Sequence, residues 1–150
     1  ACAEAISRRS NRIYERRFLN SLRRRLRHKQ KLYPEIYEMA DFRRVRTIRD
    51  FDEFYTARHG GFAGASDYYE RSSAIKVVHQ IRRPTLIIHA QDDPFIPYES
   101  FRDRALAENP YVILLTPKHG GHVGFISDNA AERFWAENRV LEFCRALLET

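Results

Sequence analysis

Two short apolar runs in the second half of the chain predict strands of one sheet. Residues 85–90 read T-L-I-I-H-A and residues 111–116 read Y-V-I-L-L-T, and a polar turn follows each run. Continuous apolar runs of this length, rich in branched side chains, are typical of buried strands in a parallel sheet. Helical patterns over 98–108 and 131–148 alternate with them. Residues 81–150 are therefore predicted to form a β-α-β-α arrangement of the α/β class.

The first 80 residues show no clear strand pattern and are predicted to be helical. Residues 5–31 are predicted to form one long amphipathic helix, and residues 35–39 a short helical piece. An apolar side chain recurs at every fourth position of the long helix: Tyr14, Phe18, Leu22 and Leu26. We expect this stripe to pack against the rest of the protein, although a basic amphipathic helix can also lie on a membrane.

A further helix is predicted from residue 47 onward. Thr47 has the side chain of an N-cap, and Asp50 falls in the first turn, where the helix dipole favours an acid. Gly60 and Gly61 are expected to end this helix, because glycine readily adopts the left-handed conformation that closes a helix.

The positive charge of the chain is concentrated in its first third. The net charge is +6, but residues 1–50 hold 15 Lys and Arg against 6 Asp and Glu. A basic segment of this kind can face nucleic acid or an anionic membrane, yet a solvated helix surface is the simpler interpretation. No basic strand with interleaved aromatics and no zinc knuckle accompanies the arginines. Nucleic acid is therefore not expected as a partner.

Composition and length indicate one soluble globular domain. The 150 residues are 43% hydrophobic and include no apolar run long enough to span a membrane. No signal-peptide core follows Ala1, which is predicted to be an internal position of a longer chain. Cys2 and Cys144 are expected to be reduced thiols rather than a disulfide. This predicts a cytoplasmic protein, with peripheral membrane contact as an open alternative.

Acidic residues and histidines follow the two predicted strands. Asp92 and Asp93 come directly after the first strand, and His119 and His122 lie in a glycine-rich loop after the second. Because the carboxyl ends of parallel strands meet at one edge of the sheet, an acid and a histidine are expected to lie close together there. An acid that orients a histidine supplies two members of a hydrolytic triad. From the residues alone either aspartate fits this role, and a turn-forming pair that caps the next helix fits equally well.

Other interpretations of the histidines are weaker. His119 and His122, together with the two aspartates, offer nitrogen and oxygen ligands to a metal, but this spacing in a loop is weak evidence. His119 is expected to be structural, and His89, inside the first strand, to be a satisfied core histidine. No metal and no organic cofactor is therefore predicted.

A nucleophilic serine is missing from the triad pattern. No serine lies in a G-x-S-x-G turn; the nearest approach, at residues 64–68, lacks the last glycine and does not follow a strand. Triads of α/β-hydrolases run serine, acid, histidine along the chain. The serine is therefore expected upstream of Ala1.

Several motifs are specific enough to indicate a family. Residues 84–95 read P-T-L-I-I-H-A-Q-D-D-P-F, and residues 119–125 read H-G-G-H-V-G-F. Residues 8–19, R-R-S-N-R-I-Y-E-R-R-F-L, and residues 47–57, T-I-R-D-F-D-E-F-Y-T-A, extend the likeness over nearly the whole chain. With these motifs the chain resembles the C-terminal half of the YheT-type esterases, the AB hydrolase-4 family of the α/β-hydrolase superfamily.

The resemblance implies both a fold and a reaction. It implies that residues 81–150 form the C-terminal part of an α/β-hydrolase core, with its last two parallel strands. Residues 1–80 would be a helical cap-like segment and its return to the core, and the N-terminal half of the fold would be absent. The implied reaction is hydrolysis of carboxylic esters, of acyl or lipid type, by a serine esterase without a cofactor. Asp93 matches the triad acid of the family and His122 the triad base.

The implied partners are a small-molecule ester and the missing N-terminal half of the same fold. Without the nucleophile, the 150 residues alone are expected to be inactive towards esters. Two alternatives stay open. One is a non-catalytic binding protein that keeps the hydrolase fold, and the other is a basic module that binds anions or a membrane surface.

Overall fold

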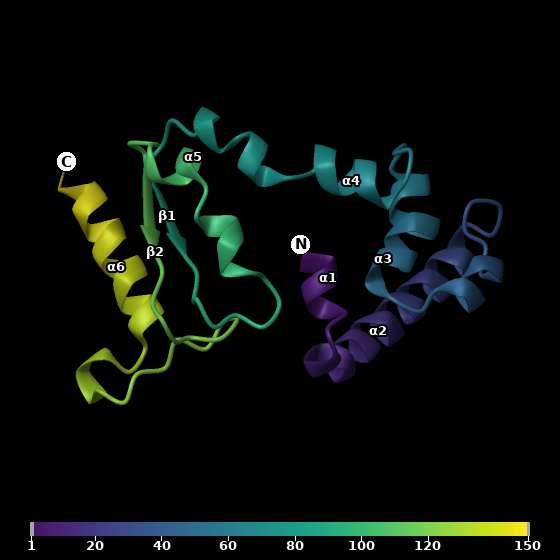
Figure 1. The fold of residues 1–150 in the computed structure, drawn as a ribbon, viewed down its shortest axis with the longest axis horizontal. Helices are drawn as coiled ribbons and strands as arrows, with labels where there is room; N and C mark the ends of the chain where they lie inside the picture. Colours follow the sequence, from purple (N-terminus) through teal and green to yellow (C-terminus); the bar gives the residue numbers. More distant parts are fainter. Residues whose placement is uncertain (1, 150) are drawn as a thin grey trace. The chain divides into compact units, whose positions relative to one another are not determined.

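The computed structural model describes residues 2–149, which divide into two compact units, one ending at Ser73 and the next beginning at Ala74. Unit 1 consists of helical elements (Figure 1): α1 (Cys2–Ile6), η1 (Arg9–Asn11), α2 (Arg12–Leu32), η2 (Ala40–Arg44), α3 (Ile48–Phe51), η3 (Asp52–Ala57) and α4 (Ala65–Arg71). Unit 2 contains two strands and further helices: η4 (Ala74–Lys76), η5 (Val78–Gln80), β1 (Thr85–Ile88), η6 (Tyr98–Phe101), α5 (Arg104–Ala107), β2 (Val112–Leu115), η7 (Ala130–Glu132) and α6 (Trp135–Leu148). The η elements are 3₁₀ turns, except that η3 is a π-helix.

The single helix predicted over 5–31 is wrong at its start, because the chain bends before α2. Arg8 has an extended backbone, and the Asn11 side-chain amide donates a hydrogen bond to the carbonyl of Ala5. These contacts separate α1 from α2, which begins at Arg12.

The buried face of α2 also differs from the predicted stripe. Leu26 is buried as predicted, but Tyr14 and Phe18 are 47% and 40% exposed. Glu15 is buried instead, and its carboxylate accepts hydrogen bonds from the Ser7 hydroxyl and from the first N–H of α3. Because a buried carboxylate needs such partners, these contacts turn this part of the helix away from the orientation that apolar spacing alone predicts.

The core of unit 1 gathers aromatic side chains around Leu26. Phe42 and Tyr55 are buried with it, and further aromatic rings pack against them: Tyr37, Phe51 and Phe54. The helical piece predicted over 35–39 is wrong, since this segment forms a turn before η2. The Tyr55 hydroxyl donates a hydrogen bond to the carbonyl of Glu38 at 3.0 Å. This carbonyl therefore binds a side chain from another segment and not a backbone N–H of a helix.

The helix predicted from residue 47 is confirmed at both ends. The Thr47 hydroxyl accepts from the N–H of Asp50, and the Asp50 carboxylate accepts from the N–H of Thr47, which makes a capping box. The helix continues through η3 and stops at Gly60, which is followed by Gly61 with a φ of +71°. Glycine adopts this left-handed conformation without the steric cost that other residues meet.

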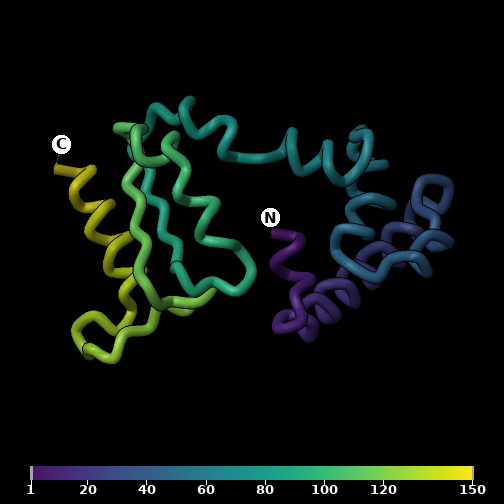
Figure 2. Tube along the Cα trace, in the orientation of Figure 1, coloured from purple at the N-terminus to yellow at the C-terminus, as the bar shows by residue number. Residues whose placement is uncertain are grey.

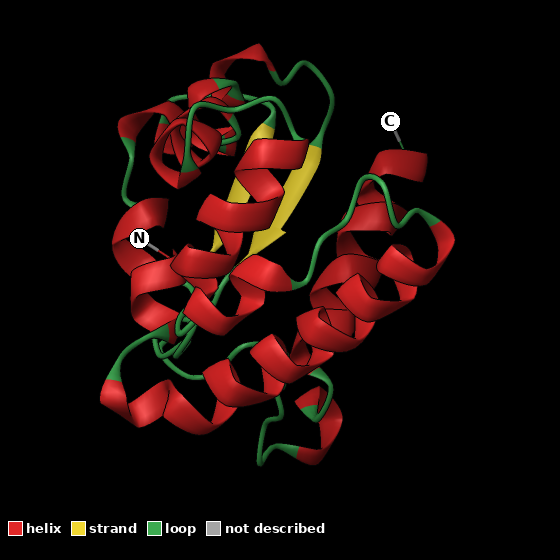
Figure 3. Ribbon diagram, turned by 90° about the vertical axis from the view of Figure 1, so that its right-hand side faces the viewer, coloured by secondary structure: helices red, strands yellow, loops and turns green. Residues whose placement is uncertain are grey.

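The two predicted strands pair in parallel, as an α/β fold requires. The register runs from Thr85 opposite Val112 to Ile88 opposite Leu115. Figure 3 shows the pair in yellow, and Figure 1 shows α6 on one side of it and α5 on the other. The strands are less buried than predicted, and Ile113 is 51% exposed, because the sheet has only two strands within residues 2–149 and leaves its flanks uncovered.

A helix cap divides the helix predicted over 98–108. After η6 the backbone is extended at Asp103, whose carboxylate accepts from the N–H of Ala105 and starts α5. The helix predicted over 131–148 is present as η7 followed by α6, and Asn129 caps η7.

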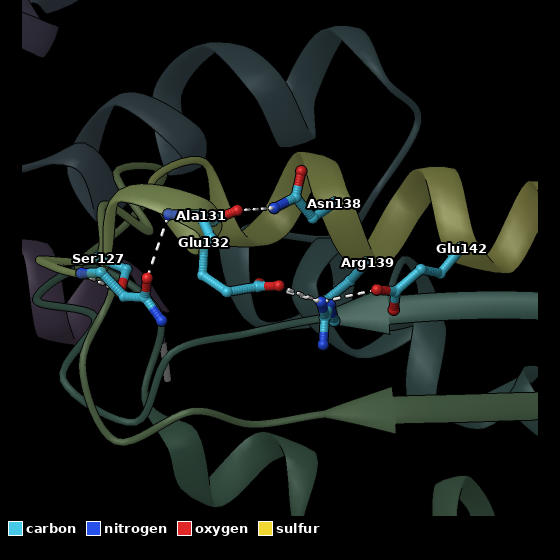
Figure 4. Close-up of polar contacts among 7 residues, drawn as sticks. Ser127, Ala131, Glu132, Asn138, Arg139 and Glu142 are labelled. Atoms are coloured by element: carbon cyan, nitrogen blue, oxygen red, sulfur yellow. Dashed lines mark hydrogen bonds and ion pairs between the residues drawn. The ribbon is translucent and has the colours of Figure 1, made fainter.

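Side-chain contacts fasten the segment before α6 to that helix (Figure 4). Arg139 Nη2 lies 3.0 Å from Glu132 Oε2 and 2.7 Å from Glu142 Oε1. The Asn138 side-chain amide donates to the carbonyl of Ala131 at 3.4 Å. Since this segment follows the loop that carries the histidines, these contacts anchor the C-terminal end of that loop.

Candidate active site

Backbone hydrogen bonds join the loops after β1 and β2 beyond the ends of the strands. The N–H of His89 donates to the carbonyl of Leu115 at 3.0 Å, and the N–H of Gln91 donates to the carbonyl of Pro117 at 2.9 Å. The side chain of Gln91 also donates to the carbonyl of Thr116. Figure 2 shows the two loops side by side. The aspartates and the histidines therefore lie at one edge of the sheet, where ligands of α/β folds bind.

Asp93 and His122 form a direct pair at this edge. Nδ1 of His122 lies 2.8 Å from Oδ2 of Asp93. The other oxygen of Asp93, Oδ1, accepts the N–H groups of Phe95 and Ile96 at 2.8 and 3.1 Å. The Asp93 side chain is only 2% exposed, whereas that of His122 is 42% exposed. A buried carboxylate thus holds one nitrogen of a histidine ring that reaches solvent.

The surroundings of Asp93 favour its ionised form. Burial works to raise the pKa of its carboxyl group, but the hydrogen bond with His122 and those from the Phe95 and Ile96 N–H groups outweigh it. The pKa of Asp93 therefore lies below the ordinary value of an aspartate. An ionised acid can hold the proton of the imidazole on Nδ1 and leave Nε2 to accept another.

Asp92 pairs with the other histidine of the loop, in a more exposed setting. Oδ2 of Asp92 lies 3.4 Å from Nδ1 of His119, whose side chain is 89% exposed. Oδ1 of Asp92 accepts the N–H of Gly121 at 2.8 Å, and this bond is the main reason that the pKa of Asp92 is lowered. Asp92 thus binds the backbone of the histidine loop, while the neighbouring Asp93 binds the ring of His122.

Glycines let the histidine loop lie close to the strand. A Cβ on Gly120 would lie 2.5 Å from the ring of Phe125 and 3.0 Å from Cβ of Ala90, and Gly121 has a φ of +59°. Phe125 itself has a φ of +48°, which is unfavourable for a bulky side chain. Its ring stacks on Trp135 of α6 with the centroids 6.1 Å apart. A strained residue held by packing is a feature of functional loops.

His89 lies near the Asp93–His122 pair, which is not predicted from the sequence. It is buried, as expected of a core histidine, and its ring stacks on Phe101 with the centroids 3.9 Å apart. Its Nδ1 is 3.8 Å from Oδ2 of Asp93, too far for a hydrogen bond, and its Nε2 is buried without a partner in residues 2–149. The expectation of a fully satisfied histidine is therefore wrong. No sequence signal separates this position from an ordinary strand histidine.

No metal cluster accompanies the pair in the described part of the chain. Across residues 2–149, no three His, Cys, Asp or Glu side chains are grouped so that they could hold a metal ion. Ser66, in the segment nearest to a G-x-S-x-G turn, lies in unit 1, where its hydroxyl accepts a hydrogen bond from Arg49.

The two cysteines, Cys2 and Cys144, are free and exposed. Within residues 2–149, no helix has the length and apolar character needed to cross a membrane.

Comparison with known proteins finds esterases and lipases. "Putative esterase YheT" of Escherichia coli is 37% identical over 152 residues, which cover 99% of this chain and 44% of that protein. "Monoacylglycerol lipase" of Saccharomyces cerevisiae is 38% identical over 95 residues, 63% of this chain and 21% of that protein. "Phospholipase ABHD3" of Mus musculus is 27% identical over 151 residues, 99% of this chain and 37% of that protein.

The chain spans less than half the length of each of these relatives. No family model matches the chain, and no solved structure matches it significantly.

Proposed function

Since the chain belongs to the YheT-type α/β-hydrolases, we propose that it carries the acid and the base of a serine esterase. One observation carries this proposal: the buried carboxylate of Asp93 lies 2.8 Å from Nδ1 of His122 at the carboxyl edge of the sheet. In this role Asp93 keeps the proton of His122 on Nδ1 and stabilises the charged imidazolium that forms during the reaction.

The nucleophile in this proposal is a serine outside these 150 residues. His122 accepts the serine proton at Nε2 while the serine oxygen attacks the ester carbonyl, and then passes the proton to the leaving alcohol. Water next attacks the acyl–serine ester and loses a proton to His122, which passes that proton to the departing serine oxygen as the carboxylic acid is released. Backbone N–H groups that stabilise the negative oxygen of the intermediate would also come from the rest of the protein.

The substrates that we propose are carboxylic esters of the acyl-lipid kind. Among the relatives are proteins named "Monoacylglycerol lipase" and "Phospholipase ABHD3". Phe95, whose ring meets the His122 ring edge-on at a centroid distance of 5.2 Å, adds an apolar surface beside the proposed base. Such a surface suits an alkyl chain better than a charged group.

The proposal predicts that the complete protein is an esterase and that the 150-residue chain alone is not. The complete protein should hydrolyse 4-nitrophenyl butyrate and be labelled covalently by a fluorophosphonate, which reacts with an activated serine. The purified chain should do neither, because its acid and base have no nucleophile to activate. Ester turnover by the chain above the buffer rate would contradict the missing nucleophile. A complete protein that is neither active nor labelled would contradict the esterase proposal.

We also propose that α2 contributes a peripheral contact with anionic membranes. The helix carries nine Lys and Arg but one acid, and that acid, Glu15, is buried and bound to Ser7. The charged side chains on the outward surface of α2 are therefore all basic. Arg24 and Arg27 are exposed on it, and each basic group near an anionic lipid surface is worth about 1 kcal/mol.

Reversing two of these charges should release the protein from anionic vesicles. We expect the Arg24→Glu, Arg27→Glu double variant to bind vesicles containing phosphatidylserine at least about tenfold more weakly than the wild-type protein. Co-sedimentation measures the bound fraction. The matched control is Arg102→Glu, Arg104→Glu, which makes the same charge change on exposed residues of unit 2. Equal loss in both variants, or no loss in the first, would contradict a contact through α2.

A further inference from the structure

Unit 1 contains a cavity that the proposed triad does not use. It has a volume of about 490 Å³ and lies between α2 and the helix formed by α3 and η3. This volume is within the range of small-molecule sites. Leu22 and Leu26 of α2 form one apolar wall, and Phe51 and Tyr55 form part of the opposite wall. The interior is thus suited to an apolar chain.

The wall of the cavity opposite α2 contains a row of stacked rings, and part of this wall is a π-helix. The rings of Phe51 and Tyr55 stack with their centroids 5.2 Å apart, and those of Tyr55 and His59 at 6.4 Å. Tyr55 and Thr56 belong to the π-helix η3. Single π-helical turns occur frequently at functional sites, where the wider turn changes which side chains face a ligand. This is an observation independent of the volume of the cavity.

The residues that line the cavity carry positive charge and no negative charge. Arg25 and Lys29 line it and are exposed, whereas Leu26 and Tyr55 are buried, so the cations lie towards solvent and the apolar groups inside. No Asp or Glu is among the lining residues. Within residues 2–149, neither Arg25 nor Lys29 forms an ion pair, and the Lys29 ammonium instead lies 5.1 Å over the ring of Tyr37. An anion would supply the missing counter-charge.

We propose that this cavity binds an amphiphile with one carboxylate head and an alkyl tail. The tail lies between the leucines of α2 and the stacked rings, and the carboxylate accepts charge-assisted hydrogen bonds from Arg25 and Lys29. A fatty acid has this chemistry and is the product that ester hydrolysis would release. The identification as a product site rests on the proposed function, whereas the binding chemistry follows from the cavity alone.

Calorimetric titration of the complete protein with decanoate tests the proposal. The wild-type protein should bind decanoate saturably, and should bind acetate and decanol much more weakly, because the site needs both the tail and the charge. The Arg25→Glu, Lys29→Glu variant should lose about tenfold or more in affinity for decanoate, since hydrogen bonds to charged groups are lost and repulsion is added. The control is Arg16→Glu, Arg17→Glu, which makes the same charge change on exposed residues of α2 that do not line the cavity.

The possible results separate this proposal from the esterase proposal. Absence of decanoate binding, binding of acetate as tight as that of decanoate, or equal losses in the two double variants would overturn the site. Ester hydrolysis is measured in parallel on the same wild-type protein. Saturable decanoate binding by a protein that hydrolyses no ester would leave the carboxylate site standing and remove only its identification as a product site.

Discussion

Replacing His122 by alanine in the complete protein should lower kcat for ester hydrolysis by about 1,000- to 10,000-fold. Alanine has no nitrogen to take the proton of the attacking serine, so both the acylation and the deacylation steps lose their general base. KM should change little, because the imidazole acts on the reacting atoms and not on the bound acyl chain. Steady-state kinetics with 4-nitrophenyl butyrate measures both constants.

The neighbouring His119 provides a matched control in the same loop. Its side chain is 89% exposed and lies 3.4 Å from the exposed carboxylate of Asp92. Substitution of an exposed residue of this kind usually changes stability by no more than about 0.5 kcal/mol. His119→Ala should therefore keep kcat within about twofold of the wild-type value. Equal losses in the two variants would show that the loop as a whole, and not the His122 imidazole, supports the reaction.

The closeness of Asp93 and His122 could be predicted from the sequence because it depends on local patterns. Two apolar runs ended by polar turns predict parallel strands, and the order of the residues then places Asp93 and His122 at one edge. The choice between Asp92 and Asp93 could not be predicted in this way. It depends on which of the two carboxylates is buried under the loop. Two adjacent aspartates in a turn look alike in the sequence, but their side chains point in different directions.

The parts of the fold for which the sequence prediction is wrong depend on side-chain hydrogen bonds that reach beyond one helical turn. Apolar spacing assigns Tyr14 and Phe18 to the buried face of α2, but the hydrogen bond between Ser7 and Glu15 buries the acid instead. The bend before α2 depends on the Asn11 amide in the same way. Capping, by contrast, is local, and the capping box that begins at Thr47 was predictable because both of its partners lie within one turn.

Asp93→Asn should lower kcat for ester hydrolysis by up to about 10,000-fold while leaving the fold of the loop in place. The amide has nearly the shape of the carboxylate and can still accept the N–H groups of Phe95 and Ile96. It carries no charge, however, and does not stabilise the imidazolium of His122. It can also donate to Nδ1 and so move the ring proton to Nε2, where the base must be free. Asp92→Asn, which changes the exposed neighbour, is the control and should retain most of the activity.

The pH dependence of stability gives a second readout of the same carboxylate, separate from activity. Because the pKa of Asp93 is lower in the folded protein than in the unfolded chain, the unfolded chain binds protons more readily. The stabilisation is therefore fully present above the ordinary carboxyl pKa of about 4 and is lost as the pH falls through the lower folded value. The difference in the free energy of unfolding between wild type and Asp93→Asn, measured by urea denaturation, should be largest near neutral pH and shrink below about pH 4. A difference that does not vary with pH would mean that the Asp93 charge is not stabilised by His122 and the two N–H groups, and the carboxylate would then be an unsuitable partner for a catalytic imidazolium.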